Sequence, residues 1–170
     1  LVVKELTHGA LMMAGQICVA AARFLVHEAA LPAFQERIKA AFEAVRVGPG
    51  QDPQSQMGAM IDRANVSRVT QLIEQAGDEG EMVLRGAALN QGAFLTPTLF
   101  RIDDLSSRLV QDELFGPIVS IERFSDEAEA VAGMVRGLAE HIGTDFVPAL
   151  NGDKLRAASD LIDVVVADDA

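Results

Sequence analysis

The sequence offers one strong candidate nucleophile, Cys18, which is the only cysteine among its 170 residues. It lies in the run GQICVAAAR at residues 15–23. A thiolate attacks carbonyl carbon readily and also leaves readily, so a cysteine can form and release covalent acyl intermediates. A free thiol is mostly protonated at neutral pH, and this chemistry therefore needs surroundings that favour the thiolate. The apolar, alanine-rich run also fits a second interpretation, in which Cys18 is a small buried core residue.

Two further side chains that could contact a ligand, Glu113 and Phe115, lie in the run QDELFGP at residues 111–117. The Gly-Pro pair forces a turn and favours an extended conformation at Gly116. Glu113 and Phe115 are therefore expected just before a strand, at the kind of sheet edge where α/β proteins bind ligands. A surface carboxylate and a core phenylalanine are the alternative interpretation.

The composition is that of a globular protein and limits the choice of partners. Hydrophobic residues make up 49% of the chain and charged residues 23%, unlike the composition of a disordered chain. The formal net charge is −11, with 25 Asp and Glu residues against 14 Lys and Arg residues. Nucleic acids and anionic membranes both attract basic surfaces, so we predict neither of them as a partner.

Cysteine and histidine usage also indicates a compartment and argues against a metal site. A single cysteine cannot form an internal disulfide, which is typical of a reducing compartment, and we expect a cytoplasmic location. His8, His27 and His141 show no metal-ligand spacing, so no metal is predicted.

Hydrophobic periodicity places the two motifs among alternating helices and strands. Apolar residues at steps of three and four, such as Leu31, Phe34 and Ile38, indicate amphipathic helices, and short β-branched runs indicate strands. Asp62 and Ser125 are expected to cap the helices that follow them. The pattern predicts helices over residues 1–13, 28–46, 62–76, from 125 onward and 154–159, and strands over residues 23–26, 82–84, 97–102, 118–124 and 162–166.

This alternation predicts the fold class, a layered α/β domain with a largely parallel sheet flanked by helices. Gly15 is expected to end the first helix, because glycine tolerates the left-handed conformation at helix ends. No Pro/Gly-rich or low-complexity linker divides the chain, so residues 1–170 are predicted to form a single domain.

Considered together, these motifs resemble those of the aldehyde dehydrogenase superfamily. Gly-Gln-x-Cys followed by an arginine five residues after the cysteine is similar to the nucleophile motif of that family. Glu-Leu-Phe-Gly-Pro, which starts at Glu113, is similar to its cofactor-ribose motif. Three further family landmarks occur between them in order, namely Val47-Gly48, Met57-Gly58 and the run GAFLTPTL at residues 92–99. The resemblance covers residues 1–130 well and the remainder loosely.

The resemblance implies NAD(P)-dependent oxidation of an aldehyde to a carboxylic acid. The Cys18 thiolate would attack the carbonyl to give a thiohemiacetal, hydride would pass to the nicotinamide of NAD or NADP, and water would hydrolyse the resulting thioester. The backbone N–H of Cys18 would donate to the developing oxyanion. Glu113 would accept hydrogen bonds from the nicotinamide ribose, and Phe115 would pack beside that end of the cofactor. Gln16 and Arg23 match the nucleophile motif without an assigned role.

The resemblance also implies parts that these 170 residues do not contain. In the family, a dinucleotide-binding domain precedes this region and carries most cofactor contacts, an oxyanion-hole asparagine and a glutamate general base. No G-x-G-x-x-G motif occurs in the sequence, so that domain is expected to be absent. The chain is thus expected to be the cysteine-bearing catalytic domain, whose exposed apolar surface predicts a homo-oligomer or a dinucleotide-binding partner domain. A small-molecule aldehyde would be its substrate.

Two alternative functions are open at this point. One is a non-catalytic interaction or oligomerisation module that keeps the family fold. The sequence Arg136-Gly137-Leu138 favours it, because the family usually has an aromatic residue before Gly-Leu. The other is a weak thiol esterase, because a cysteine beside one oxyanion donor can react with activated esters without any nicotinamide.

Overall fold

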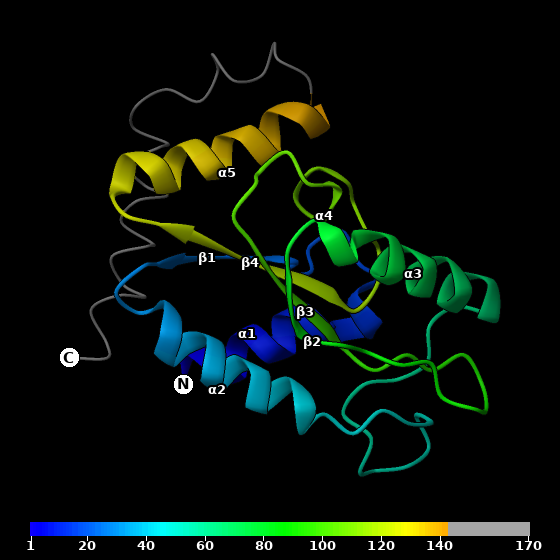
Figure 1. Ribbon diagram of the computed structural model, residues 1–170. Helices are drawn as coiled ribbons and strands as arrows, with labels where there is room; N and C mark the ends of the chain where they lie inside the picture. Colours follow the sequence, from blue (N-terminus) through cyan, green and yellow to red (C-terminus); the bar gives the residue numbers. More distant parts are fainter. Residues whose placement is uncertain (143–170) are drawn as a thin grey trace. The chain divides into compact units, whose positions relative to one another are not determined.

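The computed structural model describes residues 1–142 of the chain (Figure 1). The chain divides into two compact units, the first comprising Leu1 and Val3–Arg123 and the second comprising Val2 and the residues from Phe124 onward. The first unit holds the cysteine and both predicted cofactor residues. It therefore contains the whole of the predicted site.

A four-stranded sheet in the order β1-β4-β3-β2 forms the centre of the fold. β3 and β4 run parallel with Thr98 opposite Ile118, whereas β2 pairs with β3 in the antiparallel direction. The mostly parallel sheet and its flanking helices confirm the predicted α/β fold class. The strands are β1 (Arg23–His27), β2 (Glu81–Leu84), β3 (Thr98–Ile102) and β4 (Ile118–Phe124).

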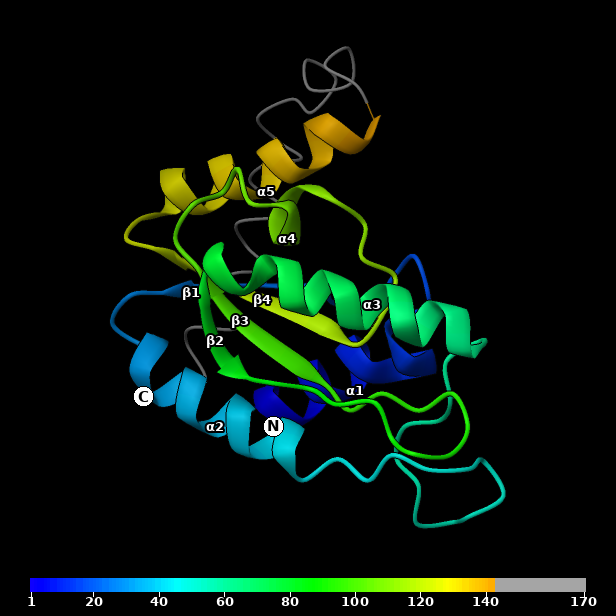
Figure 2. The ribbon, with the colours of Figure 1, turned by 45° about the vertical axis from the view of Figure 1, so that its right-hand side comes forward.

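Helices cover both faces of this sheet. α1 (Val2–Leu11) and α2 (Leu31–Glu43) lie on one side, and α3 (Arg63–Gln75) lies on the other (Figures 1 and 2). The two central strands are consequently buried along their length, with only Arg101 and Arg123 reaching solvent. Burial on both faces is typical of parallel sheets, whose strands read as continuous apolar runs.

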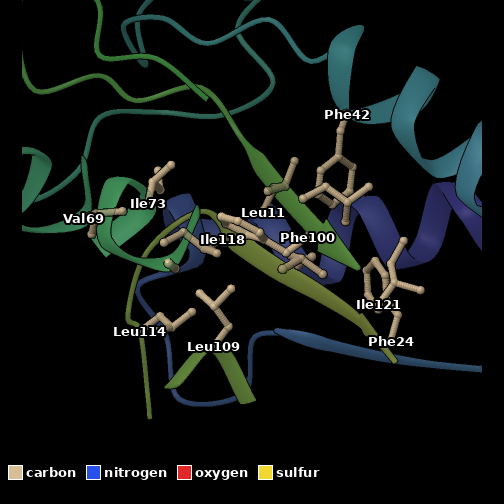
Figure 3. Packing of buried hydrophobic residues seen from close by; sticks show 14 of the residues in the cluster. Leu11, Phe24, Phe42, Val69, Ile73, Phe100, Leu109, Leu114, Ile118 and Ile121 are labelled. Carbon is tan, nitrogen blue, oxygen red and sulfur yellow. The ribbon is translucent and has the colours of Figure 1, made fainter. Parts of the chain in front are cut away.

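Apolar side chains from both layers meet the sheet (Figure 3). On one face Phe42 of α2 packs edge-on against Phe24 of β1, with 6.4 Å between the ring centroids. On the other face α3 contributes Val69 and Ile73, which are no more than 1% exposed. Burying one such side chain stabilises a fold by about 1.5–3 kcal/mol. This core fixes the strand ends from which the site is built.

α1 ends at Leu11, earlier than the predicted helix over residues 1–13. In the 3-10 segment directly after it, Met12–Gly15, both Met13 and Ala14 are left-handed, with φ of 53° and 56°. Gly15 is also left-handed, with φ of 67°, as expected for the residue that ends a helix. The prediction was wrong because Met and Ala favour right-handed helix, and nothing local indicates that they adopt the opposite hand.

α3 begins directly after Asp62, the predicted cap, whose Oδ1 accepts a hydrogen bond from the Asn65 N–H at 2.7 Å. Asp62→Ala removes this acceptor and is expected to lower the free energy of unfolding by about 1 kcal/mol. Asp62→Asn keeps an acceptor at the same place and should stay close to the wild type. Urea titration of the three proteins measures both effects. An equal loss in the two variants would contradict the capping role.

A short helix that was not predicted, α4 (Arg108–Gln111), lies directly before the loop at residues 112–117. The Glu79 carboxylate fixes its start by accepting hydrogen bonds from the Ser107 hydroxyl at 2.8 Å and from the Arg108 N–H at 2.9 Å. Four residues are too few to produce a periodic pattern, so the sequence contains no signal for this helix.

Glu79 should make stability depend on pH in the acidic range. Burial raises its pKa, but hydrogen bonds from Ser107 and Arg108, together with the Arg108 charge, outweigh burial and leave the pKa below its ordinary 4.5. Such a carboxylate stabilises the fold above its unfolded pKa and loses that contribution as the pH falls through the folded value. We expect stability below about pH 4.5 to fall more steeply in the wild type than in Glu79→Gln. Thermal unfolding across this range measures it, and parallel curves would contradict it.

The second unit contains α5 (Glu127–Ile142). The Asp126 carboxylate accepts a hydrogen bond from the Glu129 N–H at 2.9 Å, so Asp126 is the cap. The prediction of Ser125 as the cap was wrong, because Asp126 lies one residue nearer the free N–H groups of the first turn. Ser125 donates instead to the Glu129 carboxylate. The elements predicted beyond residue 142 lie outside the described residues, and none of the described helices has the length and apolarity to cross a membrane.

Candidate catalytic and cofactor site

Cys18 lies at the exposed tip of a turn that precedes β1, hereafter the cysteine turn (residues 16–20). The Ala20 N–H closes this turn by donating to the Ile17 carbonyl at 3.0 Å, and the Ala21 N–H donates to the Gly9 carbonyl of α1 at 3.2 Å. Within the described chain the N–H of Cys18 itself makes no hydrogen bond. The interpretation of Cys18 as a buried core residue is therefore wrong. The turn therefore presents an exposed thiol beside a backbone N–H that has no partner in the described chain.

Glu113 and Phe115 lie in the loop between α4 and β4, hereafter the Glu113 loop (residues 112–117). Glu113 is exposed and makes no hydrogen bond or ion pair with any described residue. Phe115 is left-handed, with φ of 49°, and 44% of it is exposed. The alternative of a core phenylalanine is wrong, because Leu114 supplies the buried side chain of this loop. A bulky residue at positive φ is strained, and such strain is common at functional sites.

The two motifs meet through their glycines, although they are far apart in the sequence. A Cβ atom on Gly15 would lie 2.2 Å from the Gly116 carbonyl oxygen and 3.1 Å from the Pro117 nitrogen. Only a glycine allows two backbones to approach this closely, and the positive φ of Gly15 also favours glycine. The cysteine turn therefore starts at a point of contact with the Glu113 loop.

α3 holds the Glu113 loop from a different direction. Arg68 donates from Nη2 to the carbonyl oxygens of Leu114 at 2.9 Å and Phe115 at 3.2 Å. A Cβ atom on Gly116 would lie 2.9 Å from Cγ2 of Val69, so the loop backbone also packs closely on the helix. Sequence reasoning missed Arg68, because one arginine on an exposed helix face carries no signal of its own.

The two motif residues without a predicted role both have partners within the fold. Gln16 accepts a hydrogen bond from the Ile61 N–H at 3.2 Å through Oε1 and donates to the Met13 carbonyl at 3.3 Å through Nε2. Arg23 of β1 forms a bidentate ion pair with Glu122 of β4, whose side chain is only 2% exposed. A buried carboxylate needs such a partner, and the pair joins the strand after the cysteine turn to the strand after the Glu113 loop.

The remaining landmarks form backbone around the sheet. Val47 and Met57 make an isolated parallel bridge, and the Gly48 N–H donates to the Met57 carbonyl at 3.0 Å. Thr98 is fully buried, and its hydroxyl accepts a hydrogen bond from the Gly86 N–H at 3.0 Å. These landmarks therefore have structural partners within the described fold.

Two segments in contact thus present an exposed thiol, an unpaired N–H, an exposed carboxylate and an exposed aromatic ring. A carboxylate accepts hydrogen bonds through two oxygens, which suits the neighbouring hydroxyl groups of a ribose. Glu113 could therefore hold a ribose, and Phe115 offers an exposed apolar surface two residues away. Among the side chains that the structure describes, no group of three His, Cys, Asp or Glu residues could hold a metal ion.

Comparison with known proteins places the matched region over this site. The model of the aldehyde dehydrogenase family matches residues 1–135. Aminoacetaldehyde dehydrogenase of Pseudomonas aeruginosa is 36% identical over 134 residues, which are 78% of this chain and 27% of that protein. Glutarate-semialdehyde dehydrogenase of Pseudomonas putida is 36% identical over 118 residues, which are 69% of this chain and 25% of that protein. The chain thus spans about a quarter of the length of these relatives.

Solved structures agree with these matches. 1-Pyrroline-5-carboxylate dehydrogenase from Thermus with bound NAD superposes with a TM-score of 0.73 and 31% identity, over 78% of this chain and 26% of that chain. Betaine aldehyde dehydrogenase from Staphylococcus aureus, in complex with NAD+ and with a BME-modified cysteine, gives a TM-score of 0.72 and 29% identity. That match covers 76% of this chain and 28% of the other.

Proposed function

The chain belongs to the aldehyde dehydrogenase family, and we propose that it supplies the nucleophile and a ribose-binding carboxylate for NAD(P)-dependent oxidation of an aldehyde to a carboxylic acid. The observation that carries this proposal is the backbone contact between Gly15 and Gly116. It joins the turn that presents Cys18 to the loop that presents Glu113. Aldehyde oxidation needs a nucleophile and a hydride acceptor side by side, and this contact supports that arrangement.

Cys18 is the nucleophile of the proposed reaction. Its thiolate adds to the aldehyde carbon, forming a C–S bond, and the carbonyl oxygen takes the negative charge. The unpaired N–H of Cys18 donates a hydrogen bond to that oxygen. Loss of hydride from the adduct leaves a thioester on Cys18, and water hydrolyses this thioester to the carboxylic acid and the free thiol.

Glu113 and Phe115 would hold the nicotinamide end of NAD or NADP. The Glu113 carboxylate has no partner among the described residues and can accept hydrogen bonds from both ribose hydroxyl groups. The exposed part of the Phe115 ring offers an apolar surface beside them. When bound, the nicotinamide supplies the acceptor for the hydride.

The proposal includes a small-molecule aldehyde as substrate, a cytoplasmic location and a protein surface that completes the site. Large apolar side chains are exposed around the cysteine turn and at the start of α3. Met13 is 65% exposed, Val19 71% and Ile61 76%. Exposed apolar side chains of this kind favour association. A dinucleotide-binding domain or a second copy of the chain would cover them and supply the remaining cofactor contacts.

Covalent acylation of Cys18 by an activated ester tests the proposal. The 170-residue chain is mixed with p-nitrophenyl acetate, and intact-protein mass spectrometry detects the acetyl adduct over time. Because the chain has one cysteine, a single hydroxylamine-sensitive acetyl group reports on Cys18 alone. We expect a burst of nitrophenolate together with one such group per chain. The proposal would be contradicted if iodoacetamide alkylates Cys18 but p-nitrophenyl acetate never acylates it.

The accessible thiol and the unpaired N–H of Cys18 also support a second function, the slow hydrolysis of activated esters without NAD(P). The two functions differ in how the acyl-cysteine is released. An esterase hydrolyses its acyl-cysteine equally fast with and without dinucleotide, whereas a dehydrogenase site responds to the dinucleotide.

A further inference from the structure

We propose that Gln16 and Arg68 are positioning residues. Through hydrogen bonds at α3 and at the residue before its cap, they hold the cysteine turn and the Glu113 loop in a fixed position relative to each other. This inference rests on the proposed function, since it concerns the same site, and it assigns roles to two side chains that the proposed chemistry does not use. Both residues are at least partly exposed, and both bond to segments distant in the sequence. Gln16 bonds to the residue before the cap of α3, and Arg68 lies on α3 itself.

Gln16 is the first of the two links. It lies between the left-handed run that ends at Gly15 and the thiol of Cys18. Its Oε1 accepts from the Ile61 N–H at 3.2 Å, and its Nε2 donates to the Met13 carbonyl at 3.3 Å. Ile61 directly precedes the cap of α3. One amide group therefore ties the cysteine turn to the start of that helix.

Arg68 is the second link, farther along the same helix. Its Nη2 donates to two successive carbonyl oxygens, those of Leu114 and Phe115, and its Nε donates to Oδ1 of Asn65 at 3.2 Å. The bond to Asn65 orients the planar guanidinium, whose fixed fork suits such a geometry better than a lysine ammonium does. A strained residue such as Phe115 keeps its positive φ only where its surroundings hold it.

The Gly15–Gly116 contact completes a closed set of contacts among the cysteine turn, the Glu113 loop and α3. Ile61, the residue before the cap of α3, bonds to Gln16 of the cysteine turn. Gly15, directly before that turn, touches Gly116 of the Glu113 loop, and Arg68 of α3 bonds to the same loop. Each segment is thus held at two points by the other two. The direction of the Cys18 N–H, which is the proposed oxyanion donor, then depends on both links.

Two reactions of the same thiol separate positioning from general damage. Acylation by p-nitrophenyl acetate passes through an oxyanion and needs the aligned N–H donor, whereas alkylation by iodoacetamide does not. We expect Gln16→Ala and Arg68→Ala each to lower the ratio of acylation rate to alkylation rate by about tenfold. In the double variant this ratio should fall by less than the product of the two single effects, because both residues support the same set of contacts. Arg68→Lys should recover part of the ratio.

Arg63→Ala is the matched control, since Arg63 is an exposed arginine on the same helix. Its ratio should equal that of the wild type. An unchanged ratio in Gln16→Ala and Arg68→Ala, or an equal fall of both rates, would overturn the proposal. If the wild type is alkylated but never acylated, the proposed function fails. Hydrogen exchange then tests separately whether Gln16 and Arg68 hold the two segments in place.

Hydrogen–deuterium exchange tests the coupling of the cysteine turn to the Glu113 loop without any chemistry at the thiol. The reporters are the Ala20 N–H in the cysteine turn and the Ile118 N–H, which donates to the Gly116 carbonyl at 2.8 Å after the Glu113 loop. Arg68→Ala should speed exchange in both peptides, and Arg63→Ala in neither. Faster exchange near Ile118 alone would show that the two segments are not coupled and would overturn the proposal.

Discussion

Replacing Cys18 by alanine is expected to abolish covalent acylation and to lower the turnover of p-nitrophenyl acetate by a factor on the order of a thousand. The chain has no other cysteine that could substitute for it. The remaining nucleophiles are hydroxyl, amine and imidazole groups, none of which lies in the cysteine turn. Stopped-flow detection of nitrophenolate measures the burst and the steady rate in both proteins.

The fold should survive this substitution, because Cys18 is exposed at the tip of a turn. Surface changes of this kind alter stability by about 0.5 kcal/mol or less, so the thermal midpoint should not move appreciably. Loss of turnover at an unchanged midpoint is a chemical effect. Unchanged turnover in Cys18→Ala would mean that Cys18 is not the nucleophile.

Gly15→Ala should have the largest effect on stability among the glycine substitutions near the site. The new Cβ would lie 2.2 Å from the Gly116 carbonyl oxygen, in a residue whose φ is 67°. A left-handed alanine and a backbone clash together should cost about 3 kcal/mol. That corresponds to a fall in Tm of roughly 10 °C for a chain of this size. Relief of the clash must also move Cys18 away from the Glu113 loop, so acylation should slow as well.

Gly50→Ala is the control for this substitution. No described atom lies within 4 Å of a Cβ at Gly50, and its φ is not in the left-handed region. Differential scanning calorimetry should show a Tm close to that of the wild type for Gly50→Ala. If Gly15→Ala and Gly50→Ala unfold at the same Tm, the Gly15–Gly116 contact does not hold the two segments.

Local signals in the sequence predicted the elements that depend on them. The step of three and four through Leu31, Phe34 and Ile38 indicated α2, and the limits expected for β4 match its residues 118–124. Asp62 caps α3 as predicted, because a cap needs only its own side chain and the next turn. The residues expected at the site came from short motifs, and the structure places Cys18 and Glu113 on two segments that touch.

The features that depend on distant contacts could not be predicted. The left-handed conformation of Met13 goes against its own preference, and no neighbouring residue type indicates it. Helix α4 depends on the Glu79 carboxylate far earlier in the chain. Arg68 has no neighbour in sequence that reveals its two carbonyl partners. The exposure of Cys18 was similarly hidden by an apolar run that reads as core.

The rate of alkylation of Cys18, measured with and without NAD, tests most directly whether the thiol and the Glu113 loop form one site. The 170-residue chain is treated with iodoacetamide, and intact mass reports the single cysteine; AMP, which lacks the nicotinamide ribose, is the control ligand. We expect that saturating NAD changes the rate severalfold, that AMP does not, and that Glu113→Gln loses most of the response. Equal rates with NAD, with AMP and without ligand would mean that Cys18 and Glu113 do not share a cofactor site.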